Sequence, residues 1–249
     1  MQYYGISDKG IIRKNNQDCF TVKSCESRSC IIAVLCDGMG GAQAGGIASE
    51  LANREFTDYV YSRLTSRTNK NPDLKSVLLT ACAKANSEAY DYSLFDISLN
   101  GMGTTIVGGI IKDNGEVKLI NVGDSRAYHF SASEGTVQQI TTDHSLVEDL
   151  VSSGVLSREQ ARVHKQKNII TRAIGTEDTV TADYFETVLA YGDMLLLCSD
   201  GLSNYVSDAE MLAAFQENSE PESFCSRMLS LTYEKGAGDN VTLVSVVNI

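Results

Sequence analysis

The chain has 249 residues, of which 43 % are hydrophobic, and a formal net charge of −11 at pH 7. Hydrophobic content of this size can form a full core, and the acidic balance argues against nonspecific nucleic-acid binding. The longest apolar runs, such as Met194 to Cys198, are far shorter than the roughly 18 residues of a membrane-spanning helix. With only two prolines and no Ser/Gly/Pro-rich linker, we predict one domain over residues 1–249.

The first half of the chain predicts a buried strand and two amphipathic helices. The strand is the apolar run from Cys30 to Cys36. From Ala42 to Leu64, apolar residues recur at four- or five-residue steps, which is typical of a helix with one buried face. A second helix is expected from Asp73 to about Phe95.

The second half is dominated by predicted strands. TTIVGGIIK and EVKLINVG flank Asp113-Asn114-Gly115, a strong hairpin signal, and RAYHF and TVQQIT flank a second turn at SASEG. Further strands are expected in TADYFETVLA, MLLLCSD and VTLVSVVNI, with helices around Asp208 to Phe215 and Pro221 to Tyr233. Residues 145–166 look helical at first and then irregular. Strict βαβ alternation is absent, so the pattern favours an α+β fold of antiparallel sheets covered by helices.

The seven cysteines do not form a zinc-binding pattern. No C-x-x-C pair occurs, and Cys19, Cys25, Cys30 and Cys36 lie five or six residues apart. Most cysteines sit in apolar runs, so reduced, structural thiols in a cytosol are expected. The first ten residues, MQYYGISDKG, lack a charged start followed by an apolar run, so no signal peptide is expected.

Several well-known catalytic motifs are missing. Gly40 and Gly45 have the spacing of phosphate-loop glycines, but Gly46 stands where that loop requires lysine. The dinucleotide pattern fails at Gln43, where a third glycine is required. Neither G-x-S-x-G nor H-E-x-x-H occurs, so a serine hydrolase and a zinc protease are unsupported.

Four aspartates lie where strands are expected to end or begin. Asp37 in VLCDGMGG and Asp200 in LLLCSDGL follow apolar runs, Asp124 in NVGDSRAY lies between two strands, and Asp239 in GAGDNVT precedes the last strand. Each one alone is typical of a turn or cap. If the strands pack side by side, however, the carboxylates converge, and clustered buried carboxylates require a cation to stay ionised.

Oxygen ligands without clustered histidine or cysteine suit Mg²⁺ or Mn²⁺. A glycine after the acid, as at Gly38, lets backbone approach such an ion closely. Bound divalent ions can activate water and hold the oxygens of a phosphate substrate. Arg13, in SDKGIIRKNNQD, could bind the phosphate in a bidentate fork, although a lone arginine is usually a surface charge.

The motifs SDKGIIRKNNQD, DGMGG, GMGTT, VGDSRAY, TDHS, NIITRAIG, LLLCSDGL and GDNVT together resemble the metal-dependent protein phosphatases, also called type 2C or PPM Ser/Thr phosphatases. They run in the family's order from residue 7 to residue 242, so the resemblance covers nearly the whole chain. The short length and the methionine in DGMGG resemble the bacterial branch, in which the phosphatase often counteracts a membrane Ser/Thr kinase. The resemblance implies a four-layer αββα sandwich of two antiparallel sheets flanked by helices.

The resemblance also implies a role for each matching residue. Asp37 would bridge two core Mn²⁺ or Mg²⁺ ions, and Gly38 would lend its carbonyl to one of them. Asp200 and Asp239 would complete the other ion, and Arg13 would bind the phosphate. Further implied roles are a third, weaker ion held by Asp124 with Asp200, a mobile flap over residues 145–167, and ordering of the water shell by Asp18 and Asn240.

Two positions depart from the family's pattern. Eukaryotic members have histidine, a proposed general acid, where this chain has Met39, and Met39 cannot donate a proton. Gln17 stands where many members have glutamate, so a neutral amide replaces a water-mediated carboxylate contact. His144 and His164 could lie near the site, but a packed or surface histidine is the simpler interpretation of each.

The expected function is hydrolysis of phosphoserine and phosphothreonine in proteins by direct attack of metal-activated water, without a phosphoenzyme. The expected partners are phosphoproteins, including a Ser/Thr kinase, and the protein is expected to be a cytoplasmic monomer that binds neither nucleic acid nor membrane. Two alternatives stay open from sequence. One is a catalytically silent module that binds phosphoproteins, against which the retained Arg13, Asp37, Asp200 and Asp239 argue. The other is a small-molecule phosphomonoesterase or nucleotidase.

Overall fold

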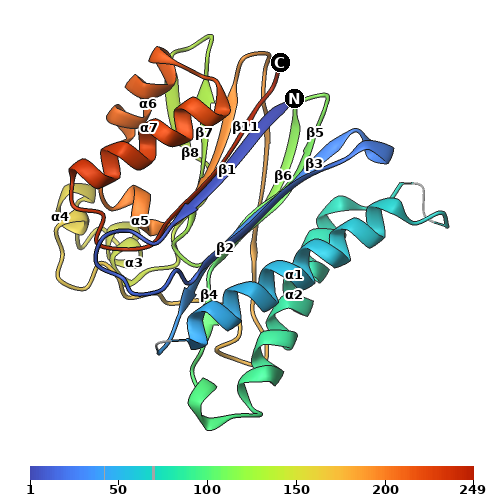
Figure 1. The fold of residues 1–249 in the computed structure, drawn as a ribbon, viewed down its shortest axis with the longest axis vertical. Helices are drawn as coiled ribbons and strands as arrows, with labels where there is room; N and C mark the ends of the chain where they lie inside the picture. The colour runs from blue at the N-terminus through green and yellow to red at the C-terminus, as the bar shows by residue number, and fades with distance from the viewer. Residues whose placement is uncertain (42, 69–70) are drawn as a thin grey trace.

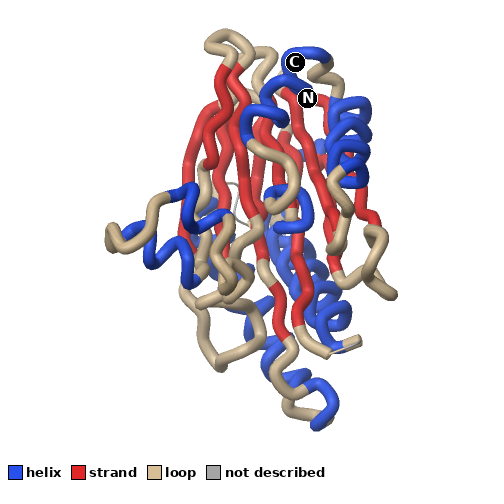
Figure 2. The backbone as a smooth tube through the Cα atoms, turned by 90° about the vertical axis from the view of Figure 1, so that its left-hand side faces the viewer, coloured by secondary structure: helices blue, strands red, loops and turns tan. Residues whose placement is uncertain are grey.

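The computed structural model of this chain describes residues 1–41, 43–68 and 71–249. Two antiparallel sheets pack face to face, and helices cover the outer face of each sheet (Figure 1). The predicted four-layer αββα sandwich is therefore confirmed. Both termini lie at one end of the sandwich, and the strands run along the long axis of the molecule (Figure 2). Within the described residues, no helix has the length and apolar character needed to cross a membrane.

The first sheet has the strand order β1-β11-β10-β7-β8. Its strands are β1 (Gln2–Asp8), β7 (Arg126–Ser131), β8 (Thr136–Gln139), β10 (Met194–Cys198) and β11 (Val241–Val247). The predicted SASEG turn joins β7 to β8, as expected. β1 was not predicted, because QYYGISD mixes polar and apolar residues without a clear period and is stabilised by its ladder to β11.

The second sheet has the strand order β2-β3-β5-β6-β9, and the short β4 (Gly103–Thr104) also pairs with β3. Its other strands are β2 (Asp18–Cys25), β3 (Cys30–Met39), β5 (Ile106–Lys112), β6 (Glu116–Val122) and β9 (Asp183–Val188). The hairpin at Asp113-Asn114-Gly115 joins β5 to β6 as predicted. β2 was missed, and β3 runs past the predicted Cys36 to Met39, because β2 and β4 continue to pair with it there.

The longer helices cover the sheets in pairs. α1 (Ala44–Thr65) and α2 (Leu74–Ser93) lie on the second sheet, whereas α6 (Asp208–Glu217) and α7 (Pro221–Glu234) lie on the first (Figure 1). The helix predicted from Ala42 begins at Ala44 in the structure, and Ala42 itself lies outside the described residues. The side chain of Asp73 caps α2 by accepting a hydrogen bond from the backbone N–H of Lys75, which explains its start.

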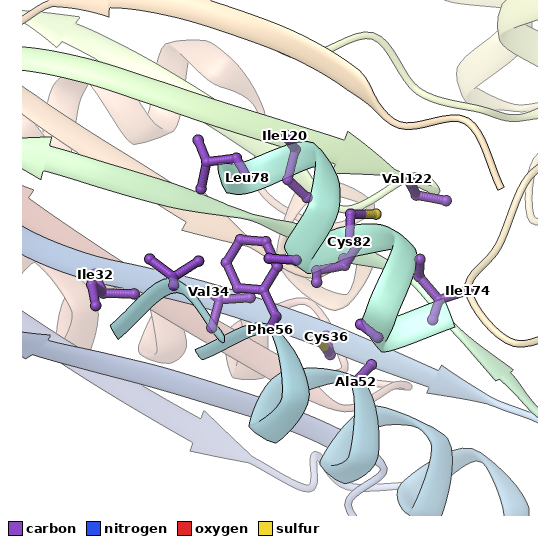
Figure 3. Close-up of a cluster of buried hydrophobic side chains, with 14 of the residues drawn as sticks. Ile32, Val34, Cys36, Ala52, Phe56, Leu78, Cys82, Ile120, Val122 and Ile174 are labelled. Carbon is purple, nitrogen blue, oxygen red and sulfur yellow. The ribbon is translucent and has the colours of Figure 1, made fainter. Parts of the chain in front are cut away.

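Three apolar layers hold the sandwich together. Figure 3 shows the layer between α1, α2 and the second sheet, where Phe56 and Cys82 from the helices meet Val34 and Ile120 from the strands. A second layer joins α6 and α7 to the first sheet around Phe130, and the third fills the space between the two sheets. All seven cysteines are free thiols and six are buried, as expected for structural residues.

Shorter helices cluster at the end of the sandwich away from the termini (Figure 1). α3 (Leu146–Ser152) and α4 (Arg158–Arg162) form the segment between β8 and β9, and α5 (Asp200–Ser203) follows β10 directly. Each of α3 and α4 begins with a serine that caps it, Ser145 and Ser157. The polar segment predicted to be helical and then irregular therefore contains two short helices.

Candidate metal centre

The two sheets bring the four predicted aspartates to one end of the sandwich, together with Asp18. Asp37 lies in β3 directly opposite Asp18 in β2, so it belongs to a strand ladder and not to a turn. The groups that shift the pKa of Asp37 identify the carboxylates that lie near it. Burial raises the pKa of Asp37 well above its usual range, and the negative charges of nearby carboxylates raise it further, namely those of Asp18, Asp200, Asp124 and Asp239.

Asp18 is the most constrained of these carboxylates. Its Oδ2 accepts a hydrogen bond from the Thr242 hydroxyl at 2.7 Å, whereas its Oδ1 is buried without a hydrogen-bond partner. Burial raises the pKa of Asp18 to about 6, and the charge of Asp200 adds to the shift. A buried carboxylate oxygen with no donor is unfavourable unless a ligand satisfies it.

Asp200 is the first residue of α5, two residues beyond the end of β10, and not the last residue of the strand as the sequence suggested. Burial raises its pKa to about 6, with the charge of Asp239 as the next cause. Its Oδ2 accepts a hydrogen bond from the Asn204 side-chain amide at 2.9 Å, one helical turn later. This amide orients the Asp200 carboxylate.

Asp239 precedes β11 and meets Arg13 from the loop between β1 and β2. Arg13 Nη2 lies 2.7 Å from Asp239 Oδ2, with about half of the arginine side chain exposed. The hydrogen bond to Asp239 raises the pKa of Arg13, and the charges of Asp200 and Asp37 contribute. The predicted phosphate-binding arginine therefore lies at the rim of the carboxylate cluster, where it stays accessible to a ligand.

Asp124 occupies the tight junction between β6 and β7, as the sequence indicated. The preceding Gly123 has φ of 108°, a conformation that a residue with a side chain rarely adopts. Asp124 is only 8 % exposed, and burial raises its pKa well above the usual range, followed by the charges of Asp200 and Asp143. Asp124 and Asp200 also line the same pocket, which has a volume of about 170 Å³.

Gly38 is required by close packing between β3 and the start of α1. A Cβ atom added at Gly38 would lie 2.1 Å from the Gly45 carbonyl oxygen and 2.6 Å from the Gln17 carbonyl oxygen. No residue with a side chain fits there. The Gln17 side-chain amide in turn donates to the Gly41 carbonyl at 3.3 Å, so it contacts the DGMGG loop even though it carries no charge.

The two threonines of GMGTT, Thr104 and Thr105, have a role that their motif alone did not predict. Thr104 Oγ1 donates to the Asp37 carbonyl at 2.9 Å, and Thr105 Oγ1 accepts from the Asp37 N–H at 3.0 Å. Both threonines are fully buried, and the Thr105 hydroxyl also lies 2.7 Å from that of Ser125. They hold the backbone of Asp37 from both sides.

Asn240 fixes the loop that carries Arg13. Its Oδ1 accepts from the Gln17 N–H at 2.8 Å, and its Nδ2 donates to the carbonyls of Lys9 and Asn15 at 2.9 and 3.0 Å. The sequence predicted that Asn240 orders water. In the structure it makes three backbone contacts that shape the loop, so its amide is already committed to the protein.

The arrangement of oxygen atoms fits divalent ions. The donor set contains carboxylates and backbone carbonyls, which are the ligands of Mg²⁺ and Mn²⁺. Asp18 Oδ1 is buried without a hydrogen-bond partner, so a bound cation would satisfy it. Within residues 1–41, 43–68 and 71–249, no three His, Cys, Asp or Glu side chains already form a ligand group; Asp239 contacts Arg13 and Asp200 contacts Asn204.

Comparison with known proteins identifies the family. Residues 12–237 match the family model described as Protein phosphatase 2C. The chain belongs to the protein phosphatase 2C family. The predicted resemblance is thereby confirmed over nearly the whole chain, and the enzyme is a protein serine/threonine phosphatase, as its relatives' names also indicate.

Two relatives place this phosphatase near bacterial members. It is 35 % identical over 240 residues to the "Serine/threonine phosphatase stp" of Listeria innocua, covering 96 % of this chain and 93 % of that protein. It is 36 % identical over 247 residues to the "Serine/threonine protein phosphatase PstP" of Mycobacterium tuberculosis, covering 98 % of this chain but 44 % of that longer protein.

Solved structures agree on the fold. The serine/threonine phosphatase Stp1 from Staphylococcus aureus matches this phosphatase with a TM-score of 0.88 at 33 % identity, covering 99 % of this chain and 94 % of that one. The catalytic domain of PstP, described "in complex with 2 Manganese ions", matches with a TM-score of 0.79 at 33 % identity, covering 98 % and 96 %.

Neither candidate histidine of this phosphatase is positioned as an obvious proton donor. His144 is 6 % exposed, its Nδ1 accepts from the Gly123 N–H at 3.0 Å, and its Nε2 faces Arg172 at 2.9 Å. Burial lowers the pKa of His144, so the neutral ring is favoured. It is the packed histidine that the sequence favoured. The Nδ1 of His164 accepts a hydrogen bond from the backbone N–H of Gln166 within the 145–167 segment.

Proposed function

We propose that this phosphatase hydrolyses phosphoserine and phosphothreonine in proteins by direct attack of water activated by bound Mn²⁺ or Mg²⁺, without a phosphoenzyme. The observation that carries the proposal is the convergence of Asp37, Asp124, Asp200 and Asp239 on one end of the sandwich, with Arg13 at its rim. The raised pKa values of Asp37, Asp124 and Asp200 show that ionising these carboxyl groups is unfavourable in the folded protein. Strongly shifted pKa values of this kind are common at functional sites.

The residues that would hold the ions are those expected from the sequence. Asp37 and the Gly38 carbonyl would bind one core ion. Asp37, Asp200 and Asp239 would bind the second core ion. Asp124 and Asp200 would bind a third ion. Such ions, when bound, supply Lewis acidity that polarises phosphoryl oxygens and lowers the pKa of water. The manganese ions named for the related PstP catalytic domain support the choice of metal.

The chain's own residues would position the substrate. The guanidinium of Arg13 can exchange its contact with Asp239 for two hydrogen bonds to phosphate oxygens, because half of its surface is exposed. Thr104 and Thr105 keep the backbone of Asp37 in place. The Asn204 amide fixes the orientation of the Asp200 carboxylate.

The leaving serine or threonine alkoxide needs a proton, and Met39 supplies none. Neither His144 nor Arg172 is available, since they contact each other and Asp183. Proton donation would therefore fall to water held near Asp124 and Asp200, in the pocket that these residues share with the 145–167 segment. We propose that this segment acts as a flap over that pocket.

The names of the relatives support phosphoproteins as substrates. We propose that a bacterial Ser/Thr kinase phosphorylates the same proteins and so opposes this phosphatase. We also propose that the phosphatase is a monomer in the cytoplasm.

One assay tests the reaction. Phosphate release should be measured from a phosphothreonine peptide and from a nucleotide, with Mn²⁺ and with EDTA. Release from the peptide that depends on Mn²⁺ is expected. Preferred nucleotide hydrolysis would instead favour a small-molecule phosphomonoesterase, and no hydrolysis at all would favour a silent binding module.

A further inference from the structure

Two basic segments border the carboxylate cluster of an otherwise acidic protein. Residues 9–16 carry Lys9, Arg13 and Lys14, and residues 162–168 carry Arg162, Lys165 and Lys167. Together they hold six of the 21 lysines and arginines of the chain and none of its 32 aspartates and glutamates. We call them the basic rim. The rest of the chain therefore contains 15 basic and 32 acidic residues. The basic rim is thus positively charged, whereas the rest of the protein is negatively charged.

Both segments are attached to the proposed metal centre. Arg13 binds Asp239, and its pKa responds to the charges of Asp200 and Asp37. On the other side, the charge of Lys167 lowers the pKa of Asp200, and Lys167 Nζ lies 3.1 Å from the oxygen of Asn204. In Figure 1 the loop between β1 and β2 and the α3–α4 segment lie at the same end of the sandwich. The rim thus flanks the cluster from two elements far apart in the sequence.

Within the described residues, four of the six rim cations are exposed and make no ion pair with the rest of the protein. Lys9, Lys14, Arg162 and Lys165 are exposed, and none of them takes part in the ion pairs formed within the described part of the chain. The backbone of each rim segment is anchored at one point: the Asn240 amide donates to the Lys9 carbonyl at 2.9 Å, and the backbone N–H of Lys167 donates to the carbonyl of His164 at 3.2 Å.

Exposed apolar side chains accompany these cations. Ile11 and Ile12 are 56 % and 70 % exposed, and Val163 is 83 % exposed. Isolated exposed apolar residues are common, but here they interrupt both basic segments beside the site. A ligand that contacts the rim would therefore meet positive charges separated by small apolar patches, with fixed backbone beneath flexible side chains.

We propose that the basic rim selects phosphopeptides with acidic residues next to the phosphorylated serine or threonine. The inference rests on the proposed function. An extended peptide advances about 3.3–3.6 Å per residue, so a phosphate held near Arg13 brings residues within a few positions of it to the rim. The rim places positive charge where acidic flanking residues of the peptide would lie.

The size of the preference follows from exposed charge pairs. Each pair of exposed opposite charges typically favours an interaction roughly two- to fivefold, and salt screens it. Two such contacts predict a preference of about fivefold or more in kcat/KM for an acidic over a neutral peptide at low salt. The contacts exist in the bound substrate as well as in the transition state, so the effect should appear mainly in KM.

The test uses three phosphothreonine peptides that differ only in flanking residues, namely Asp/Glu, Ala or Lys. Phosphate release by the full chain is measured with Mn²⁺ at about 0.05 M and about 0.5 M NaCl. The expected order is acidic, then neutral, then basic, with the differences shrinking at high salt. In the double variant Lys14→Glu with Lys165→Glu, the acidic preference should vanish or reverse. The matched control, Lys84→Glu with Arg227→Glu, changes net charge equally on the outer helices α2 and α7 and should keep the preference.

The outcomes separate this inference from the proposed function. Equal kcat/KM for the acidic and neutral peptides, or an unchanged preference in the Lys14→Glu and Lys165→Glu variant, would overturn the inference and leave the phosphatase activity intact. Loss of the preference in the control variant as well would assign it to net charge and not to the rim, which also overturns the inference. Failure to release phosphate from any of the three peptides would overturn the proposed function itself.

Discussion

Replacing Asp18 by asparagine should stabilise this phosphatase in the absence of metal. Burial raises the pKa of Asp18 to about 6 from an ordinary value near 3.8, and its Oδ1 has no hydrogen-bond partner. The folded protein therefore holds the Asp18 proton more tightly than the unfolded chain does. The contribution of this group to stability is fully present below about pH 4 and is lost as the pH rises through about 6, where the folded protein must ionise Asp18.

The magnitude follows from that difference in pKa. A shift of about two units corresponds to about 3 kcal/mol at neutral pH. Asparagine removes this penalty and can still accept the hydrogen bond from Thr242, but its amide N–H groups lack a partner, which costs about 1 kcal/mol. The net gain is about 1–2 kcal/mol, or roughly 2–8 °C in melting temperature for a chain of this size.

The assay is a series of melting curves in EDTA between pH 4 and pH 8. The advantage of Asp18→Asn over the wild type should be absent near pH 4 and largest above pH 6, and saturating Mn²⁺ should stabilise the wild type more than the variant. Asp58→Asn, on the exposed face of α1, is the control and should behave as wild type. An Asp18→Asn protein that melts below the wild type in EDTA at pH 7.5, or whose advantage is equal at pH 4 and pH 7.5, would refute the reasoning.

Three further predictions concern catalysis. Asp239→Asn keeps the size of the side chain but removes a charged ligand, so turnover should fall by orders of magnitude while the melting curve in EDTA is retained; near-normal turnover at saturating Mn²⁺ would rule out the assignment. Arg13→Ala removes the bidentate phosphate contact and should chiefly raise KM for a phosphopeptide, and an unchanged KM would exclude Arg13 as the phosphate-binding group. Asp124→Ala should lower kcat more for a phosphothreonine peptide than for an aryl phosphate, whose leaving group scarcely needs a proton. Equal losses on both substrates, or a loss that follows unfolding, would contradict that role for Asp124.

Local sequence signals were sufficient for most elements of the fold. The hairpin at Asp113-Asn114-Gly115 follows from turn chemistry, and the outer helices follow from their apolar periodicity. β1 and β2 escaped prediction because their residues are only partly buried and follow no clear period. Their strand conformation depends on pairing with other strands: β1 pairs with β11, which is distant in the sequence, and β2 pairs with β3.

The sequence by itself determined which chemical groups this phosphatase carries. The four aspartates, Arg13 and the glycine after Asp37 were recognisable because carboxylates at the ends of apolar runs are costly and because the motifs occur in a family's order.

Only the tertiary structure decided how those groups meet. It placed Asp18 opposite Asp37 and within hydrogen-bond distance of Thr242, and it held the Asp37 backbone between Thr104 and Thr105. These contacts join residues far apart in the sequence, and the contact of Asp18 with Thr242 joins the two sheets, so no local pattern encodes them. Burial and mutual repulsion, which raise the carboxylate pKa values, likewise arise only when the sheets pack and exclude water from the cluster.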